Sequence, residues 1–305
     1  MNAHAAIDRA IIPVTRLVLG GYRLFSESLD SAEIEEHLER VRVDVPAPPW
    51  QGVIEVPART LRGELDPAFV VSQWLGVEYP TIIYHHGNNE RPFDFGPLSK
   101  NSFKNVLLAK RATVRANLIA LRAPYHRSFK TYMREMAHLA NFTAMIATSC
   151  RLIESLVVRI GDAGGGPVIV SGFSLGGWVT NVHRAYYDSA TTYVPMAAGA
   201  ALDDTVIDSA WAGTVHHAVQ RAQDDVRRVL NFERAFAAVA ADDVFPLLGR
   251  HDQYVRYAVQ KRSYGARHVA TLDKGHVTLL ASAGELRAHL LAALPAGQVA
   301  AAVAR

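Results

Sequence analysis

Residues 168–177 read Val-Ile-Val-Ser-Gly-Phe-Ser-Leu-Gly-Gly: a β-branched run, then Gly-x-Ser-x-Gly, then the start of a helical pattern. This order predicts a strand, a sharp turn that carries Ser174, and a helix, which together form a nucleophile elbow. Glycine is expected at 172 and 176 because Cβ atoms there would collide where the strand and the helix pack closely. The strained turn would present the hydroxyl above the sheet edge, close to the helix N-terminus. Ser174 is therefore the candidate nucleophile, and an ordinary glycine-containing turn is the plainer alternative.

The composition is that of an ordinary globular protein. Of the 305 residues, 50% are hydrophobic and 20% charged, so the chain can form one large domain, or one domain with a lid, around a sizeable core. No apolar run approaches the roughly 18 to 20 residues that span a bilayer. The first residues lack a basic start and a continuous apolar segment, so no secretory signal is expected. The single cysteine, Cys150, excludes an internal disulfide and agrees with a reducing compartment, and we expect a cytoplasmic protein.

The charge pattern argues against nucleic acid as a partner. The formal net charge is +3, but no dense run of Lys and Arg occurs. Arg227 and Arg228 come nearest to one, and we interpret them as a solvated helix face. The mild basicity is compatible with a weak preference for acidic substrates. We expect a small-molecule acyl substrate as the partner, with no nucleic acid and no membrane span, and nothing in the sequence indicates the oligomeric state.

The first part of the chain is predicted to be a largely helical extension over residues 1–50. Asp30 followed by Glu33 has the form of a capping box, and apolar residues recur after it at helical spacing. The proline-rich run 46–49 then breaks the pattern as a linker. The pattern assigns no function to this extension.

From Trp50 onward, strands alternate with helices. The expected strands are 53–56 and 60–65, as a hairpin, and then 80–87, 117–121, 168–170, 191–196, 244–249 and 269–272. Apolar residues at steps of three or four predict a long helix over 133–160, in which Cys150 is a core residue, and a closing helix over 279–291. This alternation implies an α/β fold whose mostly parallel sheet is covered by helices on both faces.

Residues 205–241 interrupt the alternation with a rather polar helical pattern, and we interpret them as a helical lid. The core then comprises 51–204 and 242–293, and an Ala-rich tail that we expect to fray follows over 294–305. The glycine-rich run 161–166 precedes a strand, whereas a dinucleotide-binding loop follows a strand and opens a helix. We therefore interpret it as a helix stop and expect no cofactor.

A serine hydroxyl becomes a nucleophile when an imidazole takes its proton, and the imidazole needs a carboxylate to fix its tautomer. In open parallel sheets such groups gather at the carboxyl ends of the strands. His276 follows the last strand, with a flexible glycine before it and a helix after it, and is the candidate base. His251 is the main rival, while His126 and His183 are interpreted as pocket-wall and helix-surface residues.

The candidate acid is Asp252, which follows the strand over 244–249. The chain order is then Ser174, Asp252, His276, the order expected for this kind of elbow. Asp203 or Asp204 competes for the role, because each also follows the carboxyl end of a strand.

An oxyanion intermediate needs two preorganised donors. The backbone N–H of Leu175, at the start of the elbow helix, is one candidate, and the backbone N–H of Asn88 is the other. Asn89 is the alternative for the second donor, and an ordinary turn without a catalytic role is the plainer interpretation of this segment. The adjacent pair His85-His86 is not expected to chelate a metal, because successive side chains on a strand point to opposite faces. No His-Glu-x-x-His motif occurs, and we expect no metal site.

Taken together, His86-Gly87-Asn88, Gly172 to Gly176, Asp252 and Gly275-His276 resemble the α/β-hydrolase superfamily over roughly residues 51–293. The resemblance implies Ser174 as nucleophile, His276 as base, Asp252 as acid, and Leu175 with Asn88 as oxyanion donors. The helical insertion falls where many members carry a cap. The turn after Gly87 is Asn-Asn-Glu rather than the extra-glycine form of some lipases and esterases, so the resemblance does not extend to the substrate.

We expect a serine hydrolase, in the first place a carboxylic-ester hydrolase that works through an acyl-enzyme at Ser174. An acyltransferase, a thioesterase or a peptidase would use the same three residues, and a non-catalytic binding protein on the same scaffold is a further alternative. Four aromatic residues suggest an apolar acyl pocket, or equally the packing of the lid: Phe93, Phe95, Trp211 and Phe232.

Overall fold

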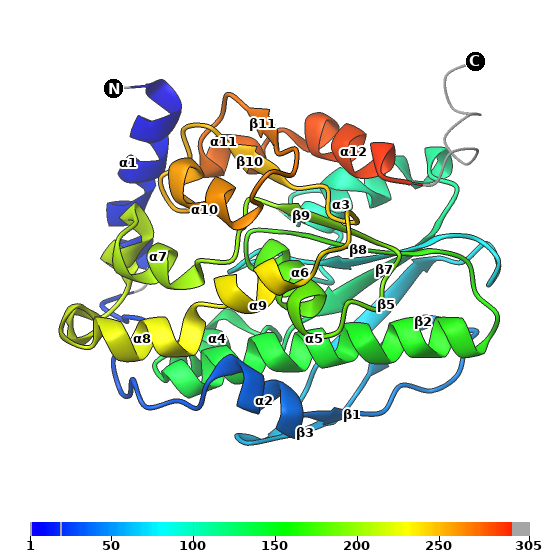
Figure 1. Cartoon of the computed structure of the whole chain (residues 1–305), viewed down its shortest axis with the longest axis horizontal. Coiled ribbons are helices and arrows are strands. Elements are labelled where there is room, and N and C mark those ends of the chain that lie inside the picture. The colour runs from blue at the N-terminus through cyan, green and yellow to red at the C-terminus, as the bar shows by residue number, and fades with distance from the viewer. Residues whose placement is uncertain (1, 19, 100, 295–305) are drawn as a thin grey trace.

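An eight-stranded sheet runs through the protein, and helices cover both of its faces (Figure 1). The computed structural model describes residues 2–18, 20–99 and 101–294, so the predicted tail lies, from residue 295 onward, outside the described residues. The strands, in spatial order, are β11 (Ala270–Leu272), β10 (Leu247–Gly249), β9 (Thr192–Met196), β8 (Val168–Phe173), β6 (Thr81–His85), β7 (Asn117–Arg122), β5 (Ala68–Gln73) and β2 (Gly52–Glu55).

The six strands from β7 to β11 are mutually parallel, whereas at one edge of the sheet β5 pairs antiparallel with β7 and β2 pairs antiparallel with β5. Because parallel strands all end at the same edge, the turns after β6, β8, β10 and β11 meet there. The predicted α/β fold with a mostly parallel sheet is confirmed. The extension precedes the sheet rather than replacing its first strands, since β2 and β5 come from within the predicted core.

One face of the sheet is covered by the longest helix together with the elbow helix. These are α5 (Leu139–Asp162) and α6 (Leu175–Tyr186), which pack on each other, and α2 (Ile34–Arg40) packs on α5. Helices α3 (Ser102–Val106), α11 (His276–Leu280) and α12 (Ala283–Ala292) lie over the other face. Strand β6 shows why both faces are apolar: Ile83 belongs to the first core, while Ile82 and Tyr84 belong to the second.

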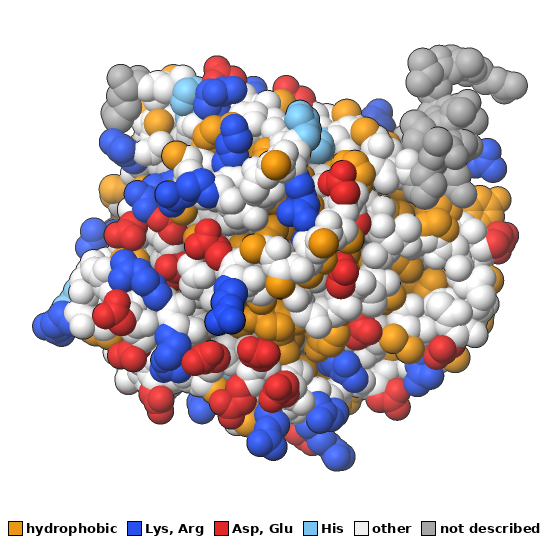
Figure 2. All heavy atoms as spheres, in the orientation of Figure 1, with side chains coloured by type: hydrophobic (Ala, Val, Ile, Leu, Met, Phe, Trp, Pro, Cys, Tyr) orange, Lys and Arg blue, Asp and Glu red, His pale blue; other side chains and the backbone are white. Residues whose placement is uncertain are grey.

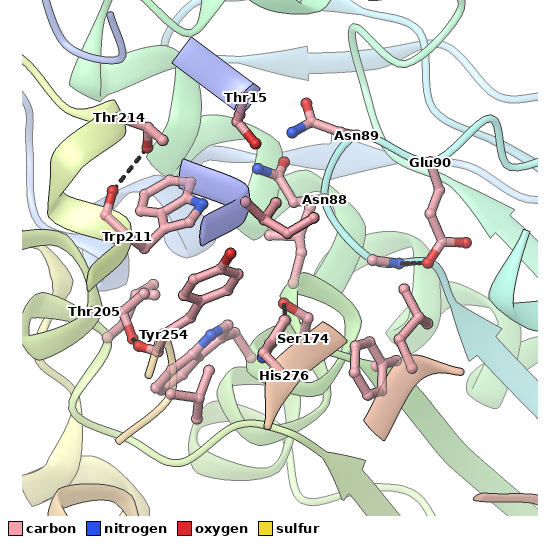
Figure 3. Close-up of a pocket in the computed structure, with 18 of the residues that line it drawn as sticks. Thr15, Asn88, Asn89, Glu90, Ser174, Thr205, Trp211, Thr214, Tyr254 and His276 are labelled. Carbon is pink, nitrogen blue, oxygen red and sulfur yellow. Dashed lines mark hydrogen bonds between the residues drawn. The ribbon is translucent and has the colours of Figure 1, made fainter. Parts of the chain in front are cut away.

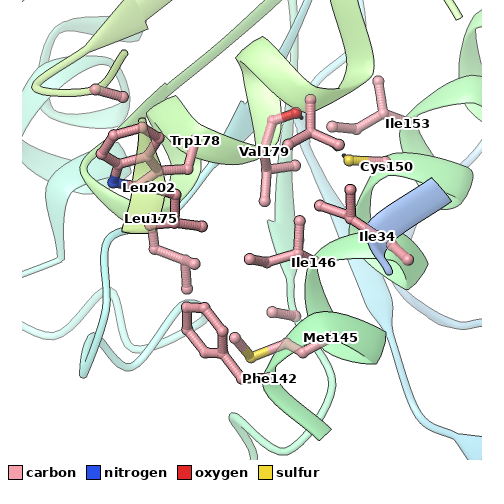
Figure 4. Close-up of a cluster of buried hydrophobic side chains, with 14 of the residues drawn as sticks. Ile34, Phe142, Met145, Ile146, Cys150, Ile153, Leu175, Trp178, Val179 and Leu202 are labelled. Carbon is pink, nitrogen blue, oxygen red and sulfur yellow. Dashed lines mark hydrogen bonds between the residues drawn. The ribbon is translucent and has the colours of Figure 1, made fainter. Parts of the chain in front are cut away.

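The first core contains the single cysteine. Cys150 lies on α5 among Ile146, Ile153 and Val179, and its thiol donates a hydrogen bond to the carbonyl oxygen of Val179 at 3.5 Å (Figure 4). Complete burial raises the pKa of this thiol. Cys150 is thus a core residue, as the helical stripe predicts.

The predicted hairpin of 53–56 with 60–65 is wrong. Strand β2 pairs instead with β5, in a register that places Val53 opposite Val70. The true hairpin is shorter and lies in a separate small sheet, where β3 (Ala58–Thr60) pairs with β4 (Gly63–Leu65) and with β1 (Arg42–Val43). Gly63 has a φ of +83°, and this left-handed conformation places the turn just before it.

Two predicted helices are shorter than expected. The long helix is divided by a break after α4 (Phe129–Glu135), because α5 begins only at Leu139. The extension contains α1 (Ala3–Val18) and α2, but most of the chain between them is irregular. The predicted capping box is also absent: Glu33 occupies the N-cap of α2, and its side chain makes no capping hydrogen bond.

The insertion over 205–241 is helical, as predicted, but it consists of short pieces. It contains the end of α7 (Leu202–Ile207), two short 3₁₀ helices, α8 (Gln223–Leu230) and α9 (Glu233–Ala238). The chain then returns to the sheet at β10, which α10 (Tyr257–Ser263) follows. The extension is joined to the insertion, since Leu24 exchanges backbone hydrogen bonds with Thr214 and His216.

Acidic and basic side chains are interspersed on the face of the molecule in Figure 2. Arg227 and Arg228 lie on this kind of solvated surface: Arg227 pairs with Asp224 and Arg228 with Glu33, both at 3.3 Å. In the described part of the chain, no helix combines the length and the hydropathy that crossing a bilayer requires.

Candidate active site

Strand β8 and helix α6 place Ser174 at a sharp bend. Its φ is +55° and its ψ is −111°, a conformation that a non-glycine residue adopts only under strain. The flanking glycines permit the bend: a Cβ on Gly172 would lie 2.5 Å from the carbonyl carbon of Gly176, and a Cβ on Gly176 would overlap the carbonyl oxygen of His85. The elbow predicted from 168–177 therefore has the expected geometry.

The bend brings Ser174 to an imidazole from the far end of the chain. His276 Nε2 lies 3.0 Å from Ser174 Oγ (Figure 3). On the other side of the ring, His276 Nδ1 lies 2.7 Å from Asp252 Oδ2. Both partners are positioned by the sheet, because Asp252 follows β10 and His276 follows β11. A proton on Nδ1 donates to the carboxylate and leaves the Nε2 lone pair facing the serine hydroxyl.

The carboxylate of Asp252 is itself fixed. Its Oδ1 accepts hydrogen bonds from the backbone N–H groups of Tyr254 and Val255, both at 2.8 Å, so Oδ2 is left for the imidazole. Burial lowers the pKa of His276, but the charge of Asp252, its hydrogen bond and the charge of Asp8 together outweigh burial, and the net pKa is raised above the ordinary 6.5. The site therefore favours a protonated imidazole, the form that appears when a base has accepted a proton.

The rival residues have other partners. Asn231 donates to Asp203 at 2.8 Å, and Arg256 forms an ion pair with Asp204. His251 contacts Asp273 at 2.6 Å on the neighbouring loops. The structure thus brings together Ser174 and His276 with Asp252, and leaves the other candidates outside this group.

The turn after β6 faces Ser174 across a cavity. Asn88 and Leu175 both line this cavity, and within the described residues neither backbone N–H has a hydrogen-bond acceptor in the protein. The side chain of Asn88 is fixed by Tyr132, whose hydroxyl donates a hydrogen bond to Asn88 Oδ1. Asn89, the alternative donor, has a φ of +61° and is the most exposed residue of the turn.

Glu90 stabilises the turn and was not predicted from the sequence. Its carboxylate accepts from the N–H of Gly87 at 3.0 Å and from both the N–H and the hydroxyl of Ser102, at 2.7 and 2.9 Å. Burial raises the pKa of this carboxyl despite these hydrogen bonds. The acidic residue after the Asn-Asn pair is the only trace of this arrangement in the sequence.

The expectation that His85 and His86 point to opposite faces is wrong. Their rings stack with centroids 4.6 Å apart, because β6 ends at His85 and the chain turns there. Every ring nitrogen of the pair has a hydrogen-bond partner, and burial lowers the pKa of His85 to about 3 and that of His86 well below its usual value. In the described ranges, no three His, Cys, Asp or Glu side chains are grouped to hold a metal ion.

Two other histidines complete the comparison with the sequence. His126 is buried against His86, with ring centroids 4.5 Å apart, and lines a second cavity, as a pocket-wall residue should. His183 is not a helix-surface residue: it is fully buried, and its Nε2 lies 3.3 Å from Glu154.

The cavity over Ser174 has a volume of about 170 Å³. Its wall is mainly apolar and comes from several parts of the chain, among them the sheet end, the insertion and helix α1 (Figure 3). The residues from the insertion and α1 are Thr205, Trp211, Thr214, Ile11, Ile12 and Thr15. Of the four aromatic residues suggested for an acyl pocket, only Trp211 lines this cavity. The other three lie elsewhere: Phe232 packs on Trp178, Phe93 lines the second cavity, and Phe95 packs against the second core.

Comparison with solved structures identifies the fold of this protein. No protein-family model and no curated protein matches this sequence. Among solved structures, an acetyl xylan esterase from Paenibacillus sp. R4 is similar over 94% of this chain and 94% of its own, at 12% identity and a TM-score of 0.52. An esterase from Pyrococcus furiosus is similar over 83% of this chain and 98% of its own, at 15% identity and a TM-score of 0.51.

An acylaminoacyl peptidase from Pyrococcus horikoshii is also similar, over 77% of this chain, at 13% identity and a TM-score of 0.51. The match spans only 39% of the length of that peptidase. The chain has the α/β-hydrolase fold, in agreement with the resemblance found in its motifs.

Proposed function

We propose that this protein is a serine hydrolase that cleaves a carboxylic ester through an acyl-enzyme at Ser174. The observation that carries the proposal is the hydrogen-bonded series from Ser174 through His276 to Asp252, with lengths of 3.0 and 2.7 Å. His276 would take the proton as the serine oxygen attacks the carbonyl carbon and return it to the leaving alcohol. Water would then attack the acyl-enzyme with the same base, releasing the acid and restoring Ser174.

The developing oxyanion would be bound by the N–H groups of Asn88 and Leu175. Both line the cavity, and neither is used by another acceptor within the described residues. Donors fixed in this way need no reorganisation when charge appears on the carbonyl oxygen.

The size of the cavity favours a short acyl chain. Its volume of about 170 Å³ is small beside the 300 to 1,000 Å³ of pockets for drug-sized ligands. Trp211 and, from α1, Ile12 are apolar residues of its wall. We treat the insertion over 205–241 as a lid because it supplies Thr205, Trp211 and Thr214 to this wall.

The proposal is tested by labelling with a fluorophosphonate probe and by turnover of p-nitrophenyl esters of increasing chain length. We expect a single adduct at Ser174, no adduct in the Ser174→Ala variant, and a preference for short acyl groups. Absence of an adduct in the wild-type protein would reject the serine mechanism, and adding an alcohol or amine acceptor would reveal a transferase by a new ester or amide product.

A further inference from the structure

The inner face of helix α1 carries one acidic side chain, Asp8, which is completely buried. Its Oδ2 accepts hydrogen bonds from the backbone N–H groups of His276, at 2.7 Å, and Gln253, at 3.1 Å, while its Oδ1 accepts from Val277 at 3.0 Å. Gln253 directly follows Asp252 in the sequence. One carboxylate therefore joins the loop that carries the proposed acid to the loop that carries the proposed base.

Backbone N–H donors stabilise the charge of Asp8. In the described part of the chain, no Lys, Arg or His side chain lies within ion-pair distance of it. A buried carboxylate is costly unless hydrogen bonds replace its water, and three N–H donors supply that replacement. Two of the three come from the first residues of α11, so the negative charge faces the start of the helix that His276 begins.

Helix α1 could not approach so closely if position 275 carried a side chain. A Cβ on Gly275 would lie 2.7 Å from Asp8 Oδ2 and 2.8 Å from the carbonyl oxygen of His4. Tyr254 also binds this helix, because its hydroxyl donates to the carbonyl oxygen of Asp8 at 2.7 Å. The glycine before His276 thus serves the approach of α1 as well as the loop.

We propose that Asp8 is a positioning residue for the reaction: it holds the loops of Asp252 and His276 in register and places a second negative charge beside the imidazole. The inference rests on the proposed function, since it assigns Asp8 a part in that same chemistry. It also gives the N-terminal extension a role, for which the sequence alone offered none.

Four acidic or phenolic groups from other elements lie near His276 or line the same cavity. Asp252 contacts the ring directly, and the Tyr254 ring lies with its centroid 5.0 Å away. Asp8 binds the backbone of His276, and Glu90 lines the same cavity. Of these, Asp252 and Asp8 are the two carboxylates whose charges raise the pKa of the imidazole.

The test is the Asp8→Asn variant, with Asp30→Asn as a matched control that removes the same charge at an exposed position. The amide keeps the volume of the carboxylate but loses the charge and one acceptor oxygen. We expect kcat to fall about tenfold or more, with KM changed less, because a charge-assisted hydrogen bond to the loop is lost. We expect the midpoint of the acid limb of the rate profile to fall by about 0.5 to 1 pH unit.

The same shift should appear without substrate, in the NMR titration of the His276 ring. A merely structural role would lower the melting temperature of Asp8→Asn but leave the ring titration of the folded protein where it is in the wild type. Unchanged midpoints in Asp8→Asn and Asp30→Asn alike would overturn the proposal. A wild-type protein that neither labels at Ser174 nor cleaves esters would instead reject the proposed function.

If Asp8→Asn does not fold, amide hydrogen exchange in the wild-type protein tests the proposal instead. The amides of Gln253, His276 and Val277 should exchange slowly, because each donates to the buried carboxylate. Fast exchange at these three amides, with the neighbouring β10 protected, would show that α1 does not hold the loops and would equally overturn the proposal.

Discussion

Replacing Asp252 by Asn should remove most of the activity while leaving the fold intact. In the protein, Oδ1 of Asp252 accepts from the N–H groups of Tyr254 and Val255, and Oδ2 accepts from His276 Nδ1. The amide oxygen of Asn must stay at the position of Oδ1, because the two backbone donors require an acceptor there. The amide NH₂ then points at the imidazole.

An NH₂ group and a ring N–H cannot donate to each other, so His276 would change tautomer. Its Nδ1 would accept from the amide, and its proton would move to Nε2, which lies 3.0 Å from Ser174 Oγ. In that state the imidazole cannot take the serine proton. A loss of tautomer and charge of this kind lowers kcat by about four orders of magnitude, equivalent to about 5.5 kcal/mol in the barrier.

The assay is steady-state hydrolysis of a short p-nitrophenyl ester at several pH values, with thermal unfolding as a check of the fold. Asp204→Asn is the matched control, because Asp204 was the competing acid and pairs instead with Arg256. We expect its kcat to stay within about threefold of the wild-type value. If Asp252→Asn kept more than a tenth of the wild-type kcat, or if Asp204→Asn lost as much, the assignment of the acid would be wrong.

Four further predictions concern the elbow, the base and the cavity. Ser174→Gly should abolish turnover. It should nevertheless raise the free energy of unfolding, measured by urea denaturation, by about 1 kcal/mol, because glycine relieves the strain at a φ of +55°. A variant less stable than the wild type would contradict the strain argument. Gly176→Ala should destabilise the protein by about 2 to 4 kcal/mol in the same measurement, since its Cβ would overlap the carbonyl oxygen of His85. The kcat/KM of the wild type should rise with pH through a midpoint above 6.5, because the raised pKa of His276 keeps the imidazole charged, and unable to accept a proton, below that midpoint. The same pKa shift also stabilises the folded protein. This stabilisation is complete at pH values below the ordinary pKa of His276 and is lost as the pH rises through the raised pKa. Trp211→Ala should move the preferred acyl chain toward longer esters by about tenfold in kcat/KM, and an unchanged chain-length profile would place the acyl group elsewhere.

The parts of the site that depend on local geometry could be predicted from the sequence. The elbow needs only a strand, two glycines and a helix in succession, and all three are visible over 168–177. Asp252 and His276 could be selected because parallel strands end at one edge of the sheet, so position along the chain translates into position in space.

What the sequence did not predict depends on contacts between distant segments. Asp8 is one acidic residue on an amphipathic helix, and its partners lie 245 or more positions away, so no local pattern distinguishes it. The hairpin was misplaced for a similar reason: β2 pairs with β5, across the small hairpin of β3 and β4 that lies between them in the sequence. His183 looked like a surface residue because its partner Glu154 comes from α5 rather than from its own helix.

The wall that α1 contributes to the cavity also bears on the order in which the molecule can be assembled. In the sequence, His276 follows its partner Asp8 by 268 residues, which corresponds to roughly 10 to 50 s of synthesis. Until the strands β10 and β11 have been made, the buried carboxylate has no N–H groups to receive it. Helix α1 can therefore dock on these loops only after β10 and β11 have emerged, so the part of the cavity wall that α1 contributes is completed after the strands of the sheet have been made.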